Sequence, residues 1–280
     1  MNIVSDANFD DEAPRRPPRW LLALIGIAAV TVLSIWAIGT PPGILGKADA
    51  VAYAICHRIE SHSFLMNGVA MPLCARCTGI YLGVMTSFLI TVAAGRTRVS
   101  RLPPLRVGVF LGVFVAAMGI DGVNSYIHLF PAGTGLYEPQ NWLRLVTGMY
   151  CGIAMFHIIF PIFNGAVWQN PDNAHGLNNL RELLGVCAVA ACVILLVLSE
   201  RPVFLWVFGV VSAFGVVMML TMIGAVFFLS VTRYDRMATR WRDLALPLLA
   251  GITIAFILIG GVDIVRFALT HTWDGFALTG

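Results

Sequence analysis

The 280-residue chain is too apolar to be a soluble protein. Hydrophobic residues make up 58% of it and charged residues only 12%, whereas a soluble domain of this length needs more charge on its surface. The net charge of +3 is small, and the arginines cluster beside apolar runs, which is the pattern of membrane topology and not of nucleic-acid binding. The composition therefore predicts a multi-pass membrane protein whose main partner is the lipid bilayer.

The chain begins with a polar arm and a first apolar run. Residues 1–19 are acidic, then basic and proline-rich, and are predicted to form a disordered cytoplasmic arm. The run 20–38 is long enough to cross a bilayer. A cleaved signal peptide is the alternative, but the run is longer than a typical signal h-region. We therefore favour a retained span.

Six further apolar runs have roughly the length needed to span. They are 78–94, 106–127, 143–163, 183–199, 203–231 and 244–269. The prediction is an all-α polytopic transmembrane helical bundle of about seven spans over residues 20–270, followed by an extracytoplasmic tail, 271–280. No internal repeat relates the spans, so a duplicated transporter architecture is not indicated.

The arginines predict the orientation of the bundle. If the N-terminus is cytoplasmic, the inner segments hold 12 of the 18 basic residues, as the positive-inside rule requires. These are Arg15, Arg16, Arg19, Arg96, Arg98, Arg101, Arg106, Arg181, Arg233, Arg236, Arg240 and Arg242. The expected location is the cell (inner, cytoplasmic) membrane, with residues 40–77 forming an extracytoplasmic loop.

That loop contains the residues whose types and spacing indicate a functional site. Cys56, His57, Cys74 and Cys77 place three thiols and an imidazole within 22 residues. They form a candidate Cys3His set for zinc, with copper or iron as alternatives; the thioethers of Met66 and Met71 would suit copper(I). Successive side chains diverge, so Cys56 or His57 can fall outside the set, which leaves three ligands and an open position for hydrolytic chemistry.

The other three cysteines have a simpler interpretation. Cys151, Cys187 and Cys192 lie inside apolar runs, where a free thiol usually packs as a small hydrophobe.

A redox function uses the same thiols differently. Cys74 and Cys77 form a C-x-x-C at the start of a predicted helix, where the helix dipole and Arg76 favour a reactive thiolate, with Cys56 as an exchange partner. A third hypothesis is a transporter or assembly subunit in which one disulfide or one metal ion merely clips the loop. The sequence leaves open whether the protein is an enzyme.

Polar residues in the spans gather at the same predicted depth. Asp121 with Asn124, Asn141 with Arg144, and Asp263 with Arg266 lie in the outer parts of three spans. We expect Asp121 to pair with Arg144 and Asp263 with Arg266, either as structural ion pairs or to bind an anionic or polar substrate. Asp121, Arg144 and Asn141 are the candidate catalytic residues.

Two small-x-x-x-small faces predict how these spans meet. Gly79-x-x-x-Gly83 and Gly148-x-x-x-Gly152 lie at the outer starts of the second and fourth spans, where glycines let two helix backbones approach closely. Packing these faces together would bring the fourth span's polar residues towards the cysteines.

The motifs around the cysteines resemble a known family, domain-of-unknown-function family number 2085, which comprises predicted integral-membrane proteins. The matching segments are Cys56–Ile59, Ser63–Phe64, Cys74–Tyr81 (CARCTGIY), Asp121–Gly122 and Asn141–Gly148. Ser61 and His62 replace an acidic residue and an arginine of the family pattern, and His62 is a candidate extra ligand. The resemblance covers about residues 50–160 and implies the membrane class and the site's location. It implies no particular reaction; a small polar or lipid-linked substrate is the expectation from the residues.

Overall fold

The computed structural model describes residues 17–128 and 135–274, so most of the predicted arm and most of the predicted tail lie outside the described residues. The described residues form eight α-helices, of which seven are long and apolar enough to cross a membrane. This confirms the all-α polytopic bundle of about seven spans. The spanning helices are α1 Arg19–Gly39, α3 Ala75–Ala93, α4 Leu105–Ile127, α5 Asn141–Val167, α6 Leu180–Leu198, α7 Pro202–Thr232 and α8 Ala245–Thr270.

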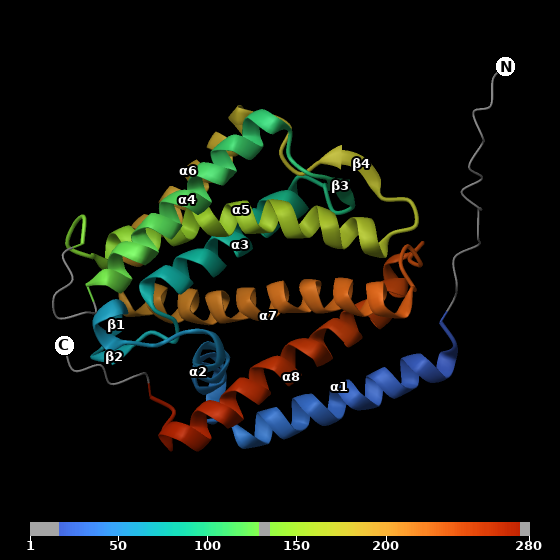
Figure 1. The fold of residues 1–280 in the computed structure, drawn as a ribbon, viewed down its shortest axis with the longest axis horizontal. Helices are drawn as coiled ribbons and strands as arrows, with labels where there is room; N and C mark the ends of the chain where they lie inside the picture. The colour runs from blue at the N-terminus through green and yellow to red at the C-terminus, as the bar shows by residue number, and fades with distance from the viewer. Residues whose placement is uncertain (1–16, 129–134, 275–280) are drawn as a thin grey trace.

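Helices α3 and α5 form the centre of the bundle. In Figure 1, α4 and α6 lie on one side of this pair, and α7, α8 and then α1 follow on the other. About 61% of the most apolar stretch of α5 is buried inside the protein, against 11% for α1. The outer helices expose large apolar side chains, among them Ile27, Leu105 and Leu195, which is what a bilayer-facing surface requires.

The backbones of α3 and α5 touch through glycines. A Cβ added at Gly152 would lie 1.9 Å from the carbonyl oxygen of Ile80, and one at Gly83 would lie 2.1 Å from that of Met149. Gly79 and Gly148 meet the opposite helix as closely. The prediction that the two small-x-x-x-small faces pack together is confirmed, because only a residue without a side chain fits between these helices.

A short helix lies where we expected only a loop. Helix α2, Gly43–Ile55, occupies the first third of the predicted loop 40–77. Alternating alanines give this segment high helix propensity and a small face. Ala48 and Ala52 pack against Ala213 of α7 and Ile259 of α8. Cys56, which follows the last residue of α2, therefore packs in the core of the bundle.

The segments between the helices contain two pairs of short strands. Strands β1 Leu65–Met66 and β2 Val69–Ala70 form an antiparallel hairpin after the 3-10 turn Glu60–His62. Its turn residues, Asn67 and Gly68, both have positive φ, as a two-residue hairpin turn requires. At the other end of the bundle, β3 Val99–Arg101 pairs in parallel with β4 Asp172–His175. A second 3-10 turn, Trp241–Leu244, leads into α8.

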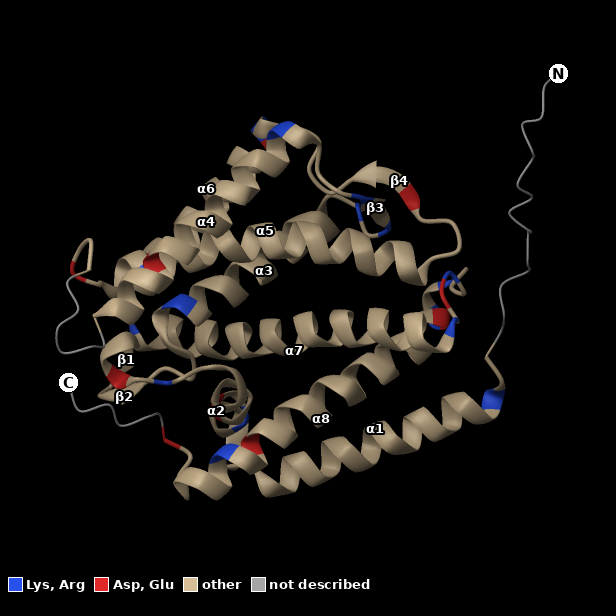
Figure 2. Cartoon of the chain, in the orientation of Figure 1, with Lys and Arg blue, Asp and Glu red and all other residues tan. Residues whose placement is uncertain are grey.

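Charged residues gather at the two ends of the bundle. Figure 2 shows that the middles of the helices carry almost no Lys, Arg, Asp or Glu. We call the end with α2, β1, β2 and the last turn of α8 the cysteine end, because Cys56, Cys74 and Cys77 lie there. The ten arginines predicted for the inner side that fall in the described residues lie at the opposite end, where Arg96 forms a two-pronged ion pair with Glu182.

Candidate metal centre

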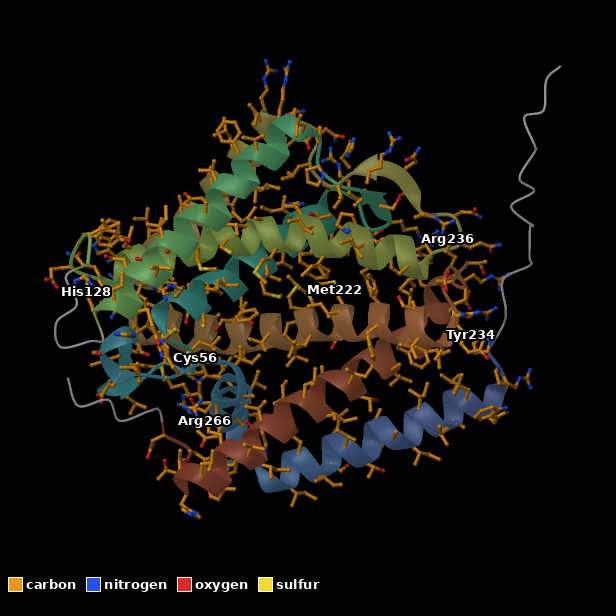
Figure 3. The ribbon with its side chains drawn as sticks, viewed as in Figure 1. Cys56, His128, Met222, Tyr234, Arg236 and Arg266 are labelled. Carbon is orange, nitrogen blue, oxygen red and sulfur yellow. The ribbon has the colours of Figure 1, made fainter. Side chains whose placement is uncertain are left out.

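Three of the predicted ligands meet at the cysteine end. The sulfur atoms of Cys56, Cys74 and Cys77 all lie within 4.8 Å of one another. Cys56 follows the last residue of α2, Cys74 is the N-cap of α3, and Cys77 lies in the first turn of α3. Figure 3 shows Cys56 between α2, α3 and α7. Two segments that are 18 residues apart therefore supply a converging set of thiols.

Backbone N–H groups surround the sulfur of Cys56. The peptide N–H of Arg58 and that of Cys74 each donate to Cys56 Sγ, at 3.4 Å. The first of these bonds needs a tight turn, which Arg58 provides with a left-handed backbone (φ 52°). Peptide donors of this kind stabilise negative charge on sulfur, and metal-bound thiolates typically accept such hydrogen bonds.

Hydrogen bonds among the three thiols shift their pKa values in different directions. Hydrogen bonds from the thiols of Cys74 and then Cys77 hold the pKa of Cys56 far below its ordinary value, despite the opposing effect of burial. The same interaction with Cys56 raises the pKa of Cys74 to about 12. These interactions favour negative charge on the sulfur of Cys56 over that of Cys74.

His57 lies beside the three sulfurs and is not one of the group. Its Nδ1 accepts a hydrogen bond from the N–H of Ile59, at 3.2 Å, so the lone pair of this nitrogen is already used. The ring packs edge-on against that of His62, with 5.3 Å between centroids. Burial lowers the pKa of both imidazoles, that of His62 to about 4. His62, the candidate extra ligand, also lies outside the sulfur group.

Arg266 of α8 holds the backbone that carries Cys56. Its guanidinium donates to the carbonyl oxygens of Tyr53, Cys56 and His57, at 2.6, 2.7 and 3.3 Å. Figure 3 places Arg266 and Cys56 at the same end of the bundle. We expected Arg266 to pair with Asp263, but Asp263 instead accepts a hydrogen bond from the indole of Trp36, at 3.0 Å. The end of α2 leaves carbonyls unsatisfied, and the guanidinium satisfies them.

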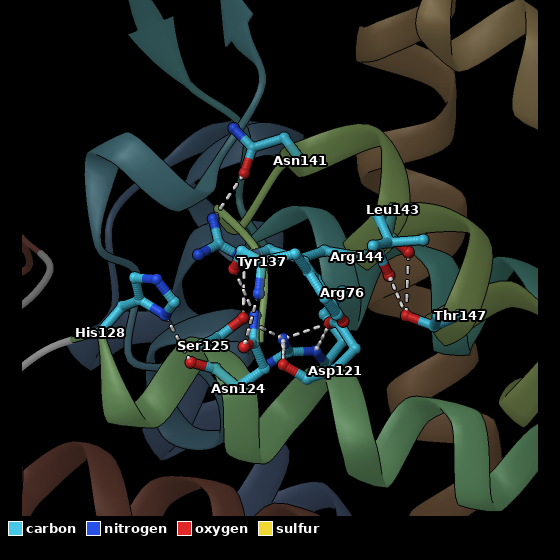
Figure 4. Close-up of polar contacts among 10 residues, drawn as sticks. All are labelled: Arg76, Asp121, Asn124, Ser125, His128, Tyr137, Asn141, Leu143, Arg144 and Thr147. Atoms are coloured by element: carbon cyan, nitrogen blue, oxygen red, sulfur yellow. Dashed lines mark hydrogen bonds and ion pairs between the residues drawn. The ribbon is translucent and has the colours of Figure 1, made fainter. Parts of the chain in front are cut away.

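Asp121 pairs with Arg76 and not with Arg144, so our prediction for this pair was wrong. Arg76 Nη2 lies 2.5 Å and Nε 3.1 Å from Asp121 Oδ2, as Figure 4 shows. Only 1% of the Asp121 side chain is exposed. Arg76 lies between Cys74 and Cys77 in the chain, so this pair anchors the first turn of α3 to α4.

Arg144 is buried without a carboxylate. In the described part of the chain, no carboxylate lies within ion-pair distance of its guanidinium, and the side chain is 5% exposed. Nη1 donates to Asn141 Oδ1 at 2.8 Å, and Nε lies 3.5 Å from Ser125 Oγ, which also accepts from Arg76. Asn141 in turn donates to the carbonyl of Ser61 at 3.1 Å, which ties the start of α5 to the segment that carries the histidines.

Two tyrosines, which the sequence did not single out, form hydrogen bonds around the site. Tyr137 donates to Asp121 Oδ1 at 3.0 Å, and its backbone carbonyl accepts from Asn124 at 2.8 Å. Tyr53 is fully buried and donates to the carbonyl of Thr272 at 2.8 Å. A tyrosine near an expected interface carries no signal that distinguishes these roles.

Comparison with known proteins gives the family. Residues 56–158 match the family described as "Predicted membrane protein (DUF2085)". An uncharacterized protein, MJ1492, from Methanocaldococcus jannaschii is 33% identical over 120 residues, which are 43% of this chain and 70% of that protein. The chain belongs to this family.

A second relative is similar to a shorter stretch of the chain. An uncharacterized protein from Methanothermobacter thermautotrophicus is 37% identical over 101 residues, which are 36% of this chain and 80% of that protein. No solved structure gives a significant match. The DUF2085 segment begins at Cys56 and ends within α5, so it contains the three cysteines, Asp121 and Arg144 but neither α1, α7 nor α8.

Proposed function

We propose that Cys56, Cys74 and Cys77 bind one transition-metal ion, with zinc as the best fit. The observation that carries this proposal is the convergence of three sulfurs within 4.8 Å, with two peptide N–H donors on one of them. Sulfur ligands select zinc, copper(I) or iron over magnesium and calcium. Three protein ligands suit a zinc site that keeps its fourth position open.

The open fourth coordination position is the reason to propose catalysis as well as a structural role for the metal. A zinc ion held by three protein ligands polarises a bound carbonyl or phosphoryl group and activates water at neutral pH. In this chain the peptide N–H donors to Cys56 Sγ and the hydrogen bond from Arg266 to the Cys56 carbonyl hold Cys56 in place. The site is thus built from rigid helix ends and not from a free loop.

Arg144 and Asn141 are the residues that we propose to orient a small polar or anionic group. Arg144 has no carboxylate partner among the described residues, and a buried guanidinium of this kind is costly unless an anion compensates it. Arg144 lies at the N-terminal end of α5, where the helix dipole also favours negative charge. Neither the first turn of α5 nor that of α3 contains an acidic residue. Arg76, in contrast, already has Asp121 as its counter-ion.

A groove offers a lipid-linked substrate a route to the cysteines. Between the end of α2 and α8 lies a groove of about 560 Å³, lined among others by Cys56, His57, Val265, Arg266 and Leu269. Val265 and Leu269 are 61% and 79% exposed, so this groove opens on the lipid-facing surface. We propose that the substrate is small and polar and carries or approaches through a lipid chain.

The arginines at the far end of the bundle support a cytoplasmic N-terminus. Ten arginines gather there in the described residues, and the cysteine end holds fewer basic residues, most of them tied into hydrogen bonds. By the positive-inside rule the cysteine end then lies outside the cytoplasm. We propose the inner, cytoplasmic membrane as the location.

Cobalt substitution tests the metal assignment. Protein stripped of metal and titrated with Co²⁺ should develop sulfur-to-cobalt charge-transfer bands that saturate at about one ion per chain. Cys56→Ser, Cys74→Ser and Cys77→Ser should each weaken Co²⁺ binding and reduce the bands. Cys187→Ser is the matched control, because Cys187 lies in α6, far along the chain from the cluster, and should change nothing. Bands of equal strength in the three cluster variants would refute the assignment.

A thiol–disulfide oxidoreductase is the second candidate. The observation that favours it is the position of Cys74 and Cys77 at the N-terminus of α3, with the sulfur of Cys56 within 4.8 Å as an exchange partner. Differential alkylation of protein in native membranes distinguishes the two functions. A redox protein should show Cys74 and Cys77 changing together between reduced and oxidised forms, whereas a metal site should keep all three thiols reduced and protected by the ion.

A further inference from the structure

A second pocket lies between α1 and α8, on a different face of α8 from the cysteine groove. It has a volume of about 590 Å³, within the usual range for small-molecule sites. Its lining is almost entirely apolar and includes four aromatic side chains. The residues that matter here are Trp36, Phe256, Gly260, Asp263, Phe267 and Trp273.

One polar side chain in this pocket has an unsatisfied atom. Asp263 is 3% exposed, and its Oδ2 accepts the N–H of Trp36 at 3.0 Å. Its Oδ1 is buried and has no hydrogen-bond partner among the residues that the structure describes. A buried polar atom is almost always paired, and an acidic residue in a membrane span is costly unless it serves a site. A residue that lines the pocket therefore carries a buried oxygen that lacks a partner in the described part of the chain.

We propose that this pocket binds an amphiphile whose ring-shaped head carries a hydroxyl group, with the hydroxyl on Asp263 Oδ1. A hydroxyl both donates and accepts, so it pairs with Oδ1 whether the carboxyl group is ionised or protonated. The aromatic walls suit a ring, because offset and edge-on ring contacts are favourable. The Trp36 and Phe256 rings already meet edge-on, at 4.8 Å between centroids, on the pocket wall.

The surroundings favour a neutral hydroxyl over a cationic head. The ammonium group of Lys47 lies 5.6 Å from the centre of the Trp36 ring, and Arg266 lies one helical turn beyond Asp263. A cationic head would meet both of these positive charges. The pocket also opens towards lipid, since its lining residues Ile35 and Ile264 are 66% and 70% exposed. An apolar tail can therefore remain in the bilayer while the ring enters from the side.

Paired probes test this inference. The full chain in lipid nanodiscs is titrated calorimetrically with para-dodecylphenol, with its methyl ether, and with dodecyltrimethylammonium, using empty nanodiscs to subtract partitioning into lipid. The phenol should bind at least tenfold more tightly than the ether, which corresponds to about 1.4 kcal/mol. In Asp263→Leu the two should bind alike, because the partner of the hydroxyl is gone.

A second variant distinguishes a filled pocket from a misfolded protein. A Cβ at Gly260 meets only Trp36 Cδ1, at 3.7 Å, so Gly260→Leu should fold normally and fill the pocket. It should abolish phenol binding without changing thermal stability. Equal binding of phenol and ether to the wild type, tighter binding of the ammonium probe, or unchanged phenol binding in Gly260→Leu would each overturn the proposal. None of these outcomes depends on the metal centre.

Discussion

Replacing Gly152 by valine should destabilise the bundle more than any other single change at a spanning glycine. A Cβ at this position would lie 1.9 Å from the carbonyl oxygen of Ile80, which is a backbone atom and can move only with α3. Overpacking usually costs about 1–3 kcal/mol, and here we expect about 3 kcal/mol or more because no side chain can give way. The midpoint of thermal unfolding in detergent, followed by size-exclusion chromatography, measures the effect.

The chain contains a matched control for this prediction. Gly108 and Gly112 form the same small-x-x-x-small spacing in α4, yet nothing lies within 4 Å of a Cβ added at either. Gly108→Val and Gly112→Val should therefore leave the unfolding midpoint nearly unchanged. If Gly108→Val lowers the midpoint as much as Gly152→Val does, close packing of α3 on α5 is not what these glycines provide.

Replacing Asp121 by asparagine should be the most damaging change to a charged residue. The carboxylate is 1% exposed and forms a two-pronged ion pair with Arg76, so the variant leaves a guanidinium without its counter-ion. Breaking a buried pair in this way costs about 3–5 kcal/mol. Since Arg76 lies between Cys74 and Cys77, the first turn of α3 should also become less protected from hydrogen exchange.

Glu182→Gln provides the comparison for Asp121→Asn. Glu182 also accepts two hydrogen bonds from an arginine, Arg96, but both side chains are about one-third exposed. A pair with this exposure contributes no more than about 1 kcal/mol, because solvent screens it. The free energy of unfolding should fall much further in Asp121→Asn than in Glu182→Gln. Equal losses would show that burial of the Asp121 pair is not important for stability.

Much of this fold follows from the sequence because lipid imposes simple rules. The ends of the seven predicted runs differ from the observed helices by no more than four residues. A bilayer fixes the length of a span, and a backbone in lipid must satisfy its own hydrogen bonds, so apolar runs identify helices reliably. The contact of α3 with α5 was also predictable, because glycines four residues apart on both helices allow the two backbones to approach closely.

The site was less predictable because it depends on side-chain direction. Composition and spacing pointed to Cys56, Cys74 and Cys77, but which arginine reaches Asp121 depends on the rotation of α3, which the sequence does not show. We assigned Arg76 to the thiols and Arg144 to Asp121, and the observed partner of Asp121 is Arg76. Helix α2 was overlooked because it is too short to span, although its alternating alanines indicated a packed helix.

Elemental analysis of the protein purified without added metal tests the central claim most directly. We predict about one zinc ion per chain in the wild type and in Cys187→Ser, and none in Cys74→Ser. The ion should stay bound through dialysis against a weak chelator, because three thiolates hold it. A wild-type protein that contains no stoichiometric zinc, copper or iron, with Cys56, Cys74 and Cys77 all fully alkylated without denaturation, would contradict the account.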